Sequence, residues 1–190
     1  NIGPVDWKTT LLWSLNRNRI DQLLPEYTNE ELGVTVHLDE MDVYSLGGAK
    51  QRLTVGGSMG DVYVNTMRTD EHGHIWMNSM TGTLETDKNN YVYAGNTNPK
   101  YTLSWRNEFN WKGISLGFML NARVGGIGVS ATQAVMDYYG VSKTSAEARD
   151  NGGVKVNGQM IDAQTWYQTI GANGTGYVGS MYVYSMTNVR

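Results

Sequence analysis

The sequence predicts an all-β protein made of long antiparallel strands. Apolar and polar residues alternate through Tyr101–Trp111 and again through Ile114–Val124, and a period of two is typical of a β-strand. A single Lys112-Gly113 pair separates the two runs, as in a two-residue hairpin turn. Glycine is abundant, at 23 of 190 residues, and charged residues make up only 17%. Because about a quarter is usual for charged residues, this composition favours a turn-rich β fold.

The two runs can be aligned because a two-residue turn fixes the register of a hairpin. Trp111 is then opposite Ile114, and all pairs on this side are apolar except the one between Asn107 and Phe118. The apolar residues on this side are Tyr101, Leu103, Trp105, Phe109 and Trp111 in the first strand, and Ile114, Leu116, Phe118, Leu120, Ala122 and Val124 in the second. The pattern therefore predicts a hairpin with one apolar face and one polar face.

Two environments could cover this apolar face, namely lipid or the core of a soluble β-sandwich. Each strand has 11 residues, and a transmembrane β-strand needs about 9–11. Tyr101 and Trp111 stand at opposite ends of the apolar stripe, where a membrane barrel carries its aromatic girdles. In the membrane interpretation the lipid-facing side chains are Trp105, Phe109, Trp111, Leu116, Phe118 and Leu120. The period alone leaves both alternatives open.

Before the hairpin, the chain offers one more long strand and several shorter ones. The long strand is predicted over residues 5–16, where every second residue is apolar or threonine. Short strands are expected near residues 34–37, 41–46, 52–55 and 61–67. Ile75–Met77 and Tyr91–Tyr93 are expected to form the two arms of an irregular hairpin.

The residues after Val124 change in character and predict a compact, partly helical insertion over about 126–175. Four short elements are expected in it, each marked by a capping residue or a turn signal. They are a helix over 131–139 capped by Ser130 with Gln133, a helix opened by the capping box Thr144–Glu147, a hairpin around Asn157-Gly158, and a helix capped by Asp162. A last strand is predicted over 177–190.

The two ends of the hairpin differ, and the difference favours the membrane interpretation. A tight Lys112-Gly113 turn closes one end, whereas a long structured insertion follows the other. Outer-membrane barrels have short periplasmic turns and long extracellular loops, and a sandwich has no need of this asymmetry. The sequence contains no run of 18 apolar residues, so no transmembrane helix is predicted.

Five stretches of the sequence share one resemblance. They are Gly95–Tyr101, Phe109–Gly113 with the strand that follows it, Ala131–Gly140, Gly152–Gly158 and Tyr182–Arg190. Together they resemble the SusC/RagA family of TonB-dependent outer-membrane transporters of Bacteroidetes. The Asn-Pro-Lys stretch before a strand–Lys-Gly–strand hairpin is quite specific to that family. The resemblance covers most of the chain and is least clear over Leu23–Gly48.

The resemblance implies that residues 1–190 are an antiparallel transmembrane β-barrel segment with long extracellular loops carrying short helices. It would be a fragment from the C-terminal half of a transporter, with the plug domain absent. The implied partners are the rest of the barrel and plug, a SusD-like surface lipoprotein lid, TonB acting through the plug, and outer-membrane lipid. The implied function is active import of glycans or peptides, with no enzymatic activity and no cofactor. A secreted carbohydrate-binding β-sandwich module is the alternative.

Four aromatic residues of the insertion are candidates for contact with a ligand or the lid, namely Tyr138, Tyr139, Trp166 and Tyr167. Aromatic rings can stack on sugars, and Tyr hydroxyls can form hydrogen bonds. The alternative is that these rings pack the small core of the insertion itself. Arg106, Glu108 and Arg123 lie on the polar face of the hairpin and are expected to be solvated charges of the lumen.

Other function classes find little support in the sequence. The net charge is −3 and no basic block occurs, so a nucleic-acid partner is not indicated. Cysteine is absent, which excludes a disulfide framework and a Cys-ligated metal site. The segment Asp70–His74 carries side chains that can bind metals, but it is expected to be a polar turn. No metal site is therefore predicted.

Overall fold

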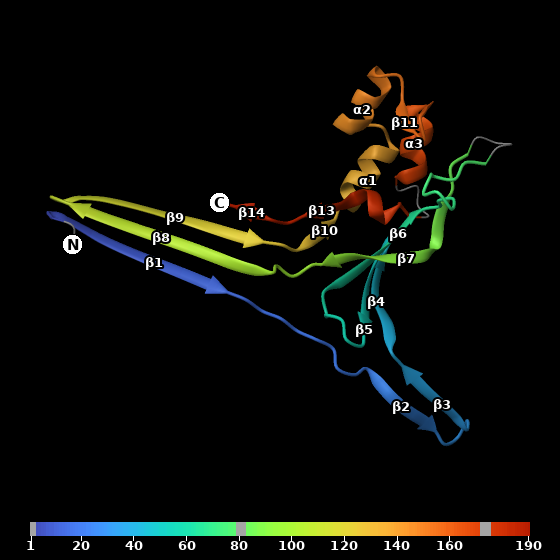
Figure 1. The fold of residues 1–190 in the computed structure, drawn as a ribbon, viewed down its shortest axis with the longest axis horizontal. Helices are drawn as coiled ribbons and strands as arrows, with labels where there is room; N and C mark the ends of the chain where they lie inside the picture. The colour runs from blue at the N-terminus through green and yellow to red at the C-terminus, as the bar shows by residue number, and fades with distance from the viewer. Residues whose placement is uncertain (1–2, 79–82, 172–175) are drawn as a thin grey trace.

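The structure, a computed structural model, describes residues 3–78, 83–171 and 176–190. The described residues form mostly antiparallel β-sheet, as the sequence predicts. Two four-stranded sheets dominate, and three short helices pack at one end of the molecule (Figure 1). Among the described residues, no helix is both long enough and apolar enough to cross a membrane.

The first four-stranded sheet, called the long sheet here, has the order β1-β8-β9-β14. Its strands are β1 (Val5–Ser14), β8 (Tyr101–Trp111), β9 (Ile114–Val124) and β14 (Asn188–Val189). The β8–β9 register is the predicted one, from Trp111 opposite Ile114 to Asn107 opposite Phe118. Lys112 and Gly113 both have positive φ angles, 45° and 88°, as a tight hairpin turn of this kind requires.

Strand β1 pairs with β8 along its whole length, although about a hundred residues separate the two in the sequence. Trp7 lies opposite Phe109 and Trp13 lies opposite Leu103. Paired residues share a face, so the apolar side of β1 extends the apolar side of the hairpin to three strands. Figure 1 shows these strands as a single-layered arm that projects away from the rest of the molecule.

The second sheet has the order β4-β5-β6-β7 and lies at the end of the long sheet where β8 begins (Figure 1). Its strands are β4 (Glu40–Leu46), β5 (Ala49–Thr54), β6 (Asp61–Met67) and β7 (Thr86–Asn96). A separate hairpin of β2 (Leu24–Asn29) and β3 (Val34–Leu38) precedes it. The short strands expected near 34–37, 41–46, 52–55 and 61–67 are confirmed within a few residues. Strand β2 was not predicted, because its sequence, which includes Pro and Glu, does not alternate between apolar and polar residues.

The irregular hairpin expected from Ile75–Met77 and Tyr91–Tyr93 is wrong. Tyr91–Tyr93 belongs to β7 and pairs with β6, where Tyr93 lies opposite Tyr63. Ile75 and Met77 instead form isolated bridges with Thr69 and Leu84. Strand β6 offers a full-length partner, and a long ladder satisfies more backbone groups than a three-residue pairing.

Among the described residues, the insertion after β9 holds three helices, one small hairpin and one further short strand. The elements are β10 (Ile127–Val129), α1 (Ala131–Tyr138), α2 (Lys143–Asp150), β11 (Val154–Val156), β12 (Gln159–Ile161) and α3 (Ala163–Ile170). Ser130 and Asp162 cap α1 and α3 as predicted, and the turn between β11 and β12 lies at Asn157-Gly158. The predicted cap of α2 is wrong. Its N-cap is Ser142, whose hydroxyl accepts the Ser145 N–H at 3.1 Å.

The expectation of one continuous strand over 177–190 is also wrong. The segment forms a 3₁₀ helix η1 (Gly179–Tyr182), then β13 (Val183–Ser185), which pairs with β10, and finally β14, which pairs with β9. Tyr177, Val178 and Tyr182 are almost fully buried. Burial of these apolar side chains therefore draws the segment into the core before it can join the long sheet.

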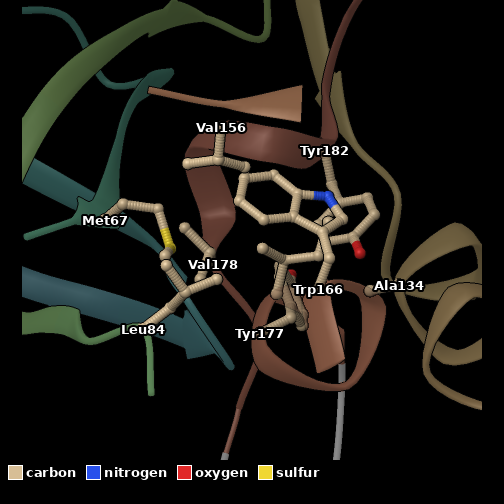
Figure 2. Packing of buried hydrophobic residues seen from close by; sticks show 9 residues of the cluster. Met67, Leu84, Ala134, Val156, Trp166, Tyr177, Val178 and Tyr182 are labelled. Carbon is tan, nitrogen blue, oxygen red and sulfur yellow. The ribbon is translucent and has the colours of Figure 1, made fainter. Parts of the chain in front are cut away.

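The main hydrophobic core lies between the second sheet and the helices. Its buried members are Met67, Leu84, Ala134, Val156, Trp166, Ile170, Tyr177, Val178 and Tyr182. Figure 2 shows Val178 between the pair Met67 and Leu84 on one side and Trp166 with Tyr182 on the other. The long sheet contributes no residue to this core, so its apolar side chains lie elsewhere.

Candidate functional site

The long sheet exposes one continuous apolar surface, called the apolar face here. It consists of Val5, Trp7, Leu11 and Trp13 of β1, Leu103, Trp105, Phe109 and Trp111 of β8, and Ile114, Leu116, Phe118 and Leu120 of β9. Leu11 and Ile114 are each 65% exposed, and Leu116 is 62% exposed. Isolated exposed apolar residues are ordinary, but a contiguous patch of this kind marks an interaction surface.

The six residues predicted to face lipid all lie on the apolar face. Five of them are exposed, namely Trp105, Trp111, Leu116, Phe118 and Leu120. Phe109 is half-buried, because its ring stacks on Trp7 at 5.9 Å and contacts Phe118 at 6.3 Å between centroids. The structure thus brings the predicted set together in one plane, and pairing with β1 adds a third row of apolar side chains to it.

A polar seam, formed by Thr9 and Asn107, interrupts the middle of the apolar face on β1 and β8, while Phe118 continues the apolar row on β9. The two residues are paired across β1 and β8. The Trp7 indole N–H donates to Asn107 Oδ1 at 3.1 Å, and the Trp105 indole N–H donates to Thr9 Oγ1 at 3.0 Å. Asn107 is only 1% exposed, so the neighbouring rings cover its amide. Sequence reasoning found Asn107 but not Thr9, because the β1–β8 pairing that joins them was not predicted.

The opposite face of the long sheet is mainly polar, although Leu12 and Met119, which are 64% and 53% exposed, also lie on it. Arg106 and Glu108 form an ion pair there, and Arg123 donates to the Thr97 carbonyl at 3.1 Å. These are the three charges predicted to be solvated in a lumen. Both ion-paired side chains are substantially exposed, and exposed ion pairs contribute little to stability. The sheet therefore has one mainly apolar face and one mainly polar face.

Three of the four aromatic residues predicted to contact a ligand lie together. Tyr138, Tyr139 and Tyr167 line a cavity of about 150 Å³ between α1 and α3, and the rings of Tyr138 and Tyr139 meet edge to face at 5.2 Å. Tyr139 is 72% exposed, and burial raises the pKa of the Tyr167 hydroxyl. Trp166 instead packs in the core (Figure 2), as the packing alternative expects for this ring.

A second cavity, of about 480 Å³, lies between the second sheet and α3. No charged residue of the described part of the chain lines it, and its polar groups are hydroxyls and amides, including those of Asn65, Tyr91 and Gln168. Tyr177 is 4% exposed, and its hydroxyl has no hydrogen-bond partner among the described residues. A buried hydroxyl without a partner is costly, but this oxygen is closed off from solvent and is not an accessible group of the cavity. Sequence reasoning missed it, because its walls come from distant segments.

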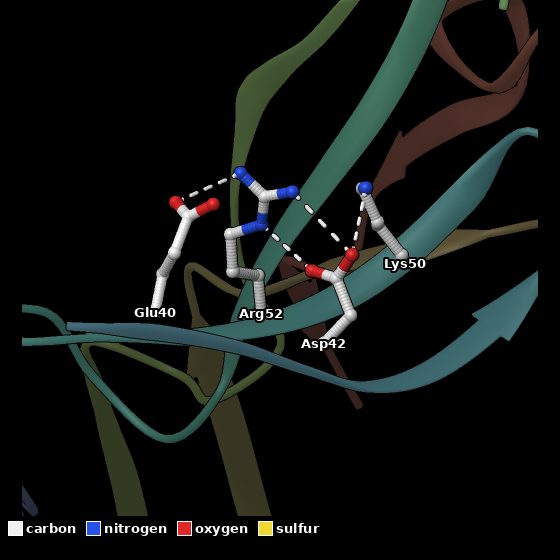
Figure 3. Close-up of polar contacts among 4 residues, drawn as sticks. All are labelled: Glu40, Asp42, Lys50 and Arg52. Atoms are coloured by element: carbon white, nitrogen blue, oxygen red, sulfur yellow. Dashed lines mark hydrogen bonds and ion pairs between the residues drawn. The ribbon is translucent and has the colours of Figure 1, made fainter. Parts of the chain in front are cut away.

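The charged residues of the second sheet form a structural cluster (Figure 3). Arg52 contacts Asp42 at 2.7 Å and Glu40 at 3.1 Å, and Lys50 contacts Asp42 at 2.8 Å. The hydrogen bond from Arg52 lowers the pKa of Asp42 to about 2. Lys50 also lies over the Tyr91 ring, 3.8 Å from its centroid. Each acid faces a base across the β4–β5 pair, so the cluster joins two strands and leaves no reactive carboxylate free.

The segment Asp70–His74 forms a polar turn, as predicted. The Asp70 carboxylate accepts the backbone N–H groups of His72 at 2.9 Å and His74 at 2.8 Å, and the His74 bond is the main reason why the pKa of Asp70 is lowered. In the described part of the chain, no group of three or more His, Cys, Asp or Glu residues could hold a metal ion.

Comparison with protein-family models gave no match for this chain. No curated protein matches it either.

Proposed function

We propose that this chain forms part of the wall and outer loops of an outer-membrane, TonB-dependent transporter barrel of the SusC/RagA type. The observation that carries the proposal is the uncovered apolar face of a single-layered sheet. Its strands β8 and β9 have 11 residues each, the length that crosses a bilayer when tilted. Apolar residues outward and polar residues inward are the alternation of membrane barrel strands.

The soluble sandwich is the weaker alternative. A sandwich covers the apolar side of one sheet with a second sheet at about 10 Å. Here the second sheet lies beyond the end of the long sheet and not over it (Figure 1). With Leu11, Ile114 and Leu116 more than 60% exposed, the apolar face lacks a covering layer within the described residues. Lipid would supply that cover along the full strand length.

The free edge of β1 supports the presence of further strands. Strand β1 stands at one end of the sheet order and pairs only with β8 among the described strands. Its outer backbone groups would cost several kcal/mol each in lipid unless another strand satisfied them. The remainder of the barrel would supply that strand, and the plug with its TonB contact would lie in the same transporter.

The second sheet and the helical insertion, called the loop-side region here, would contact the cargo or a SusD-like lid. The described residues that line the 480 Å³ cavity carry hydroxyl and amide groups and no charge. The exposed Tyr139 ring beside Tyr138 offers an aromatic surface. Uncharged hydrogen-bonding groups together with aromatic rings suit a neutral, hydroxyl-rich ligand. This favours a glycan over a charged peptide as the cargo.

A matched pair of substitutions tests the membrane proposal. Trp105→Arg places a charge on the apolar face, and Ser104→Arg places the same charge one residue away on the polar face. In a bilayer, Trp105→Arg is expected to lower the free energy of unfolding by about 2–4 kcal/mol and to reduce the amount of protein in the outer membrane. Ser104→Arg is expected to change little.

The opposite pattern would support the sandwich. In that case the Trp105→Arg protein would be recovered from the soluble fraction, folded and unable to bind sugar. Equal membrane content and equal stability of the two variants would contradict the lipid-facing assignment.

A further inference from the structure

A groove lies at the loop-side end of the apolar face, where β1 ends and β8 begins. Its volume is about 710 Å³. The side chains that matter for its chemistry are Trp13, Leu15, Arg17, Pro99, Lys100 and Tyr101. The groove therefore continues the apolar face at one side and ends in basic residues at the other.

The basic residues of the groove are free. Neither Arg17 nor Lys100 forms an ion pair with any described carboxylate. By contrast, Lys50, Arg52 and Arg68 each face an acid at 2.7–3.1 Å. Two unpaired cations beside one apolar groove create a local positive site in a chain whose net charge is −3.

A buried acid, Asp61, is not among the residues that line the groove. Asp61 is 7% exposed, and its carboxylate accepts hydrogen bonds from the Ser58 N–H at 2.7 Å and the Asn96 amide at 2.8 Å. Asn18 in turn accepts bonds from the Ser58 hydroxyl at 2.7 Å and the Met59 N–H at 2.9 Å. These contacts fix the segment that follows β1 against the second sheet, so Arg17 is held close to the groove.

We propose that this groove binds the phosphorylated headgroup of an anionic lipid, with the acyl chains lying on the apolar face. The inference rests on the proposed membrane location. Trp and Tyr side chains favour the boundary between hydrocarbon and headgroups, where Trp13 and Tyr101 would lie. Basic side chains near that boundary extend toward the polar region, where Arg17 and Lys100 would contact phosphate. The negative net charge of the chain gives no general attraction to such lipids, so the local cations determine the preference.

The experiment uses the protein carrying this chain, purified from membranes, and mixed micelles with equal amounts of phosphatidylglycerol and phosphatidylcholine. Native mass spectrometry measures how much of each lipid the protein retains. The protein is expected to retain phosphatidylglycerol preferentially. Arg17→Gln with Lys100→Gln is expected to reduce that preference about 25-fold, since each basic side chain at an anionic surface contributes about fivefold. Retention of phosphatidylcholine is expected to stay unchanged.

A control variant removes the same two charges from another place. Lys143 and Lys155 are exposed in the helical insertion, so Lys143→Gln with Lys155→Gln matches the change in net charge and is expected to keep the lipid preference. An equal loss in both double variants would overturn the groove as the site. Displacement of the lipid by inorganic phosphate alone would also overturn it, because the ligand would then be a free anion.

The two proposals fail in different ways. If the unchanged protein retains both lipids equally, the lipid groove is wrong while the membrane wall stands. If the protein is recovered only from the soluble fraction and retains no lipid, the proposed function itself is wrong.

Discussion

Trp166 and Trp105 carry the same side chain in two different surroundings. Trp166 is 9% exposed and packs among the core residues that join the second sheet to the helices. Trp105 is 40% exposed on a sheet that has one layer and no core of its own. Burying a large apolar side chain stabilises a fold by about 1.5–3 kcal/mol. The loop-side region gains this within its own fold, whereas no described residue covers the apolar face of the long sheet.

Removing the Trp166 ring gives the largest expected effect. Trp166→Ala would leave a cavity in the core and is expected to lower the free energy of unfolding of the loop-side region by about 3–5 kcal/mol. Hydrogen exchange of the α1 and α3 amides would measure the loss. Trp105→Ala, the matched variant in the long sheet, is expected to leave those amides unchanged. Loss of protection in both variants would show that the two regions unfold as one unit.

A charge on the apolar face comes next. In a bilayer, Trp105→Arg and Ser104→Arg are expected to differ by about 2–4 kcal/mol in their free energy of unfolding. Hydrogen exchange of the α1 and α3 amides, which reports only on the loop-side region, is expected to be the same in both variants. The comparison then separates a defect of membrane insertion from a general defect of folding. Loss of protection at α1 and α3 in Trp105→Arg alone would contradict the separation of the two regions.

Substitutions at two glycines, Gly48 and Gly117, compare how tightly the loop-side region and the long sheet are packed. A Cβ at Gly48 would meet the Tyr177 carbonyl, the Asn65 side chain and the Gly179 N–H, whereas a Cβ at Gly117 would come no closer than 3.8 Å to Asn107. Gly48→Ala is expected to lower the free energy of unfolding by about 1–3 kcal/mol or more, and Gly117→Ala is expected to be neutral. Chemical denaturation followed by circular dichroism would measure both. Equal effects would mean that the junction at Gly48 can relax.

The smallest expected effect concerns Asp42. Its pKa is lowered to about 2 by Arg52 and Lys50, so the stabilisation is fully present above the ordinary value of about 3.9 and is lost as the pH falls through about 2. The side chain is 40% exposed, and screening limits the contribution to about 1 kcal/mol or less. Asp42→Asn is expected to lower stability by that amount at neutral pH and to flatten the acid dependence between pH 4 and pH 2. An unchanged acid profile would mean that solvent screens this pair fully.

The β8–β9 hairpin was predictable because two local rules agree on it. Its alternation fixes which face is apolar, and the two-residue turn at Lys112-Gly113 fixes which residues pair. Both rules act over neighbouring residues, so the pairing from Trp111–Ile114 onward matches the structure. The same reasoning places the six predicted lipid-facing residues on one side of the sheet. That lipid covers them stays a prediction.

Three other features could not be predicted, because each depends on contacts between residues that are far apart in the sequence. The polar seam of Thr9 and Asn107 exists only through the β1–β8 pairing, which no local signal specifies. Trp166 and Tyr139 look alike as aromatic residues of one insertion, yet one is 9% exposed and the other 72%. The alternation at the end of the chain predicts a strand, but burial of Tyr182 in the core overrides that local preference.

Spin labelling along β9 tests most directly whether the apolar face lies against lipid. The chain has no native cysteine, so single cysteines can carry nitroxide labels at alternating positions, Ser115, Leu116, Gly117, Phe118, Leu120 and Asn121. In bilayers, labels at 116, 118 and 120 are expected to collide with the lipid-soluble relaxation agent oxygen. Labels at 115, 117 and 121 are expected to collide with a water-soluble nickel chelate. A period of two with this phase would support the barrel wall, and water access at 116, 118 and 120 would contradict it.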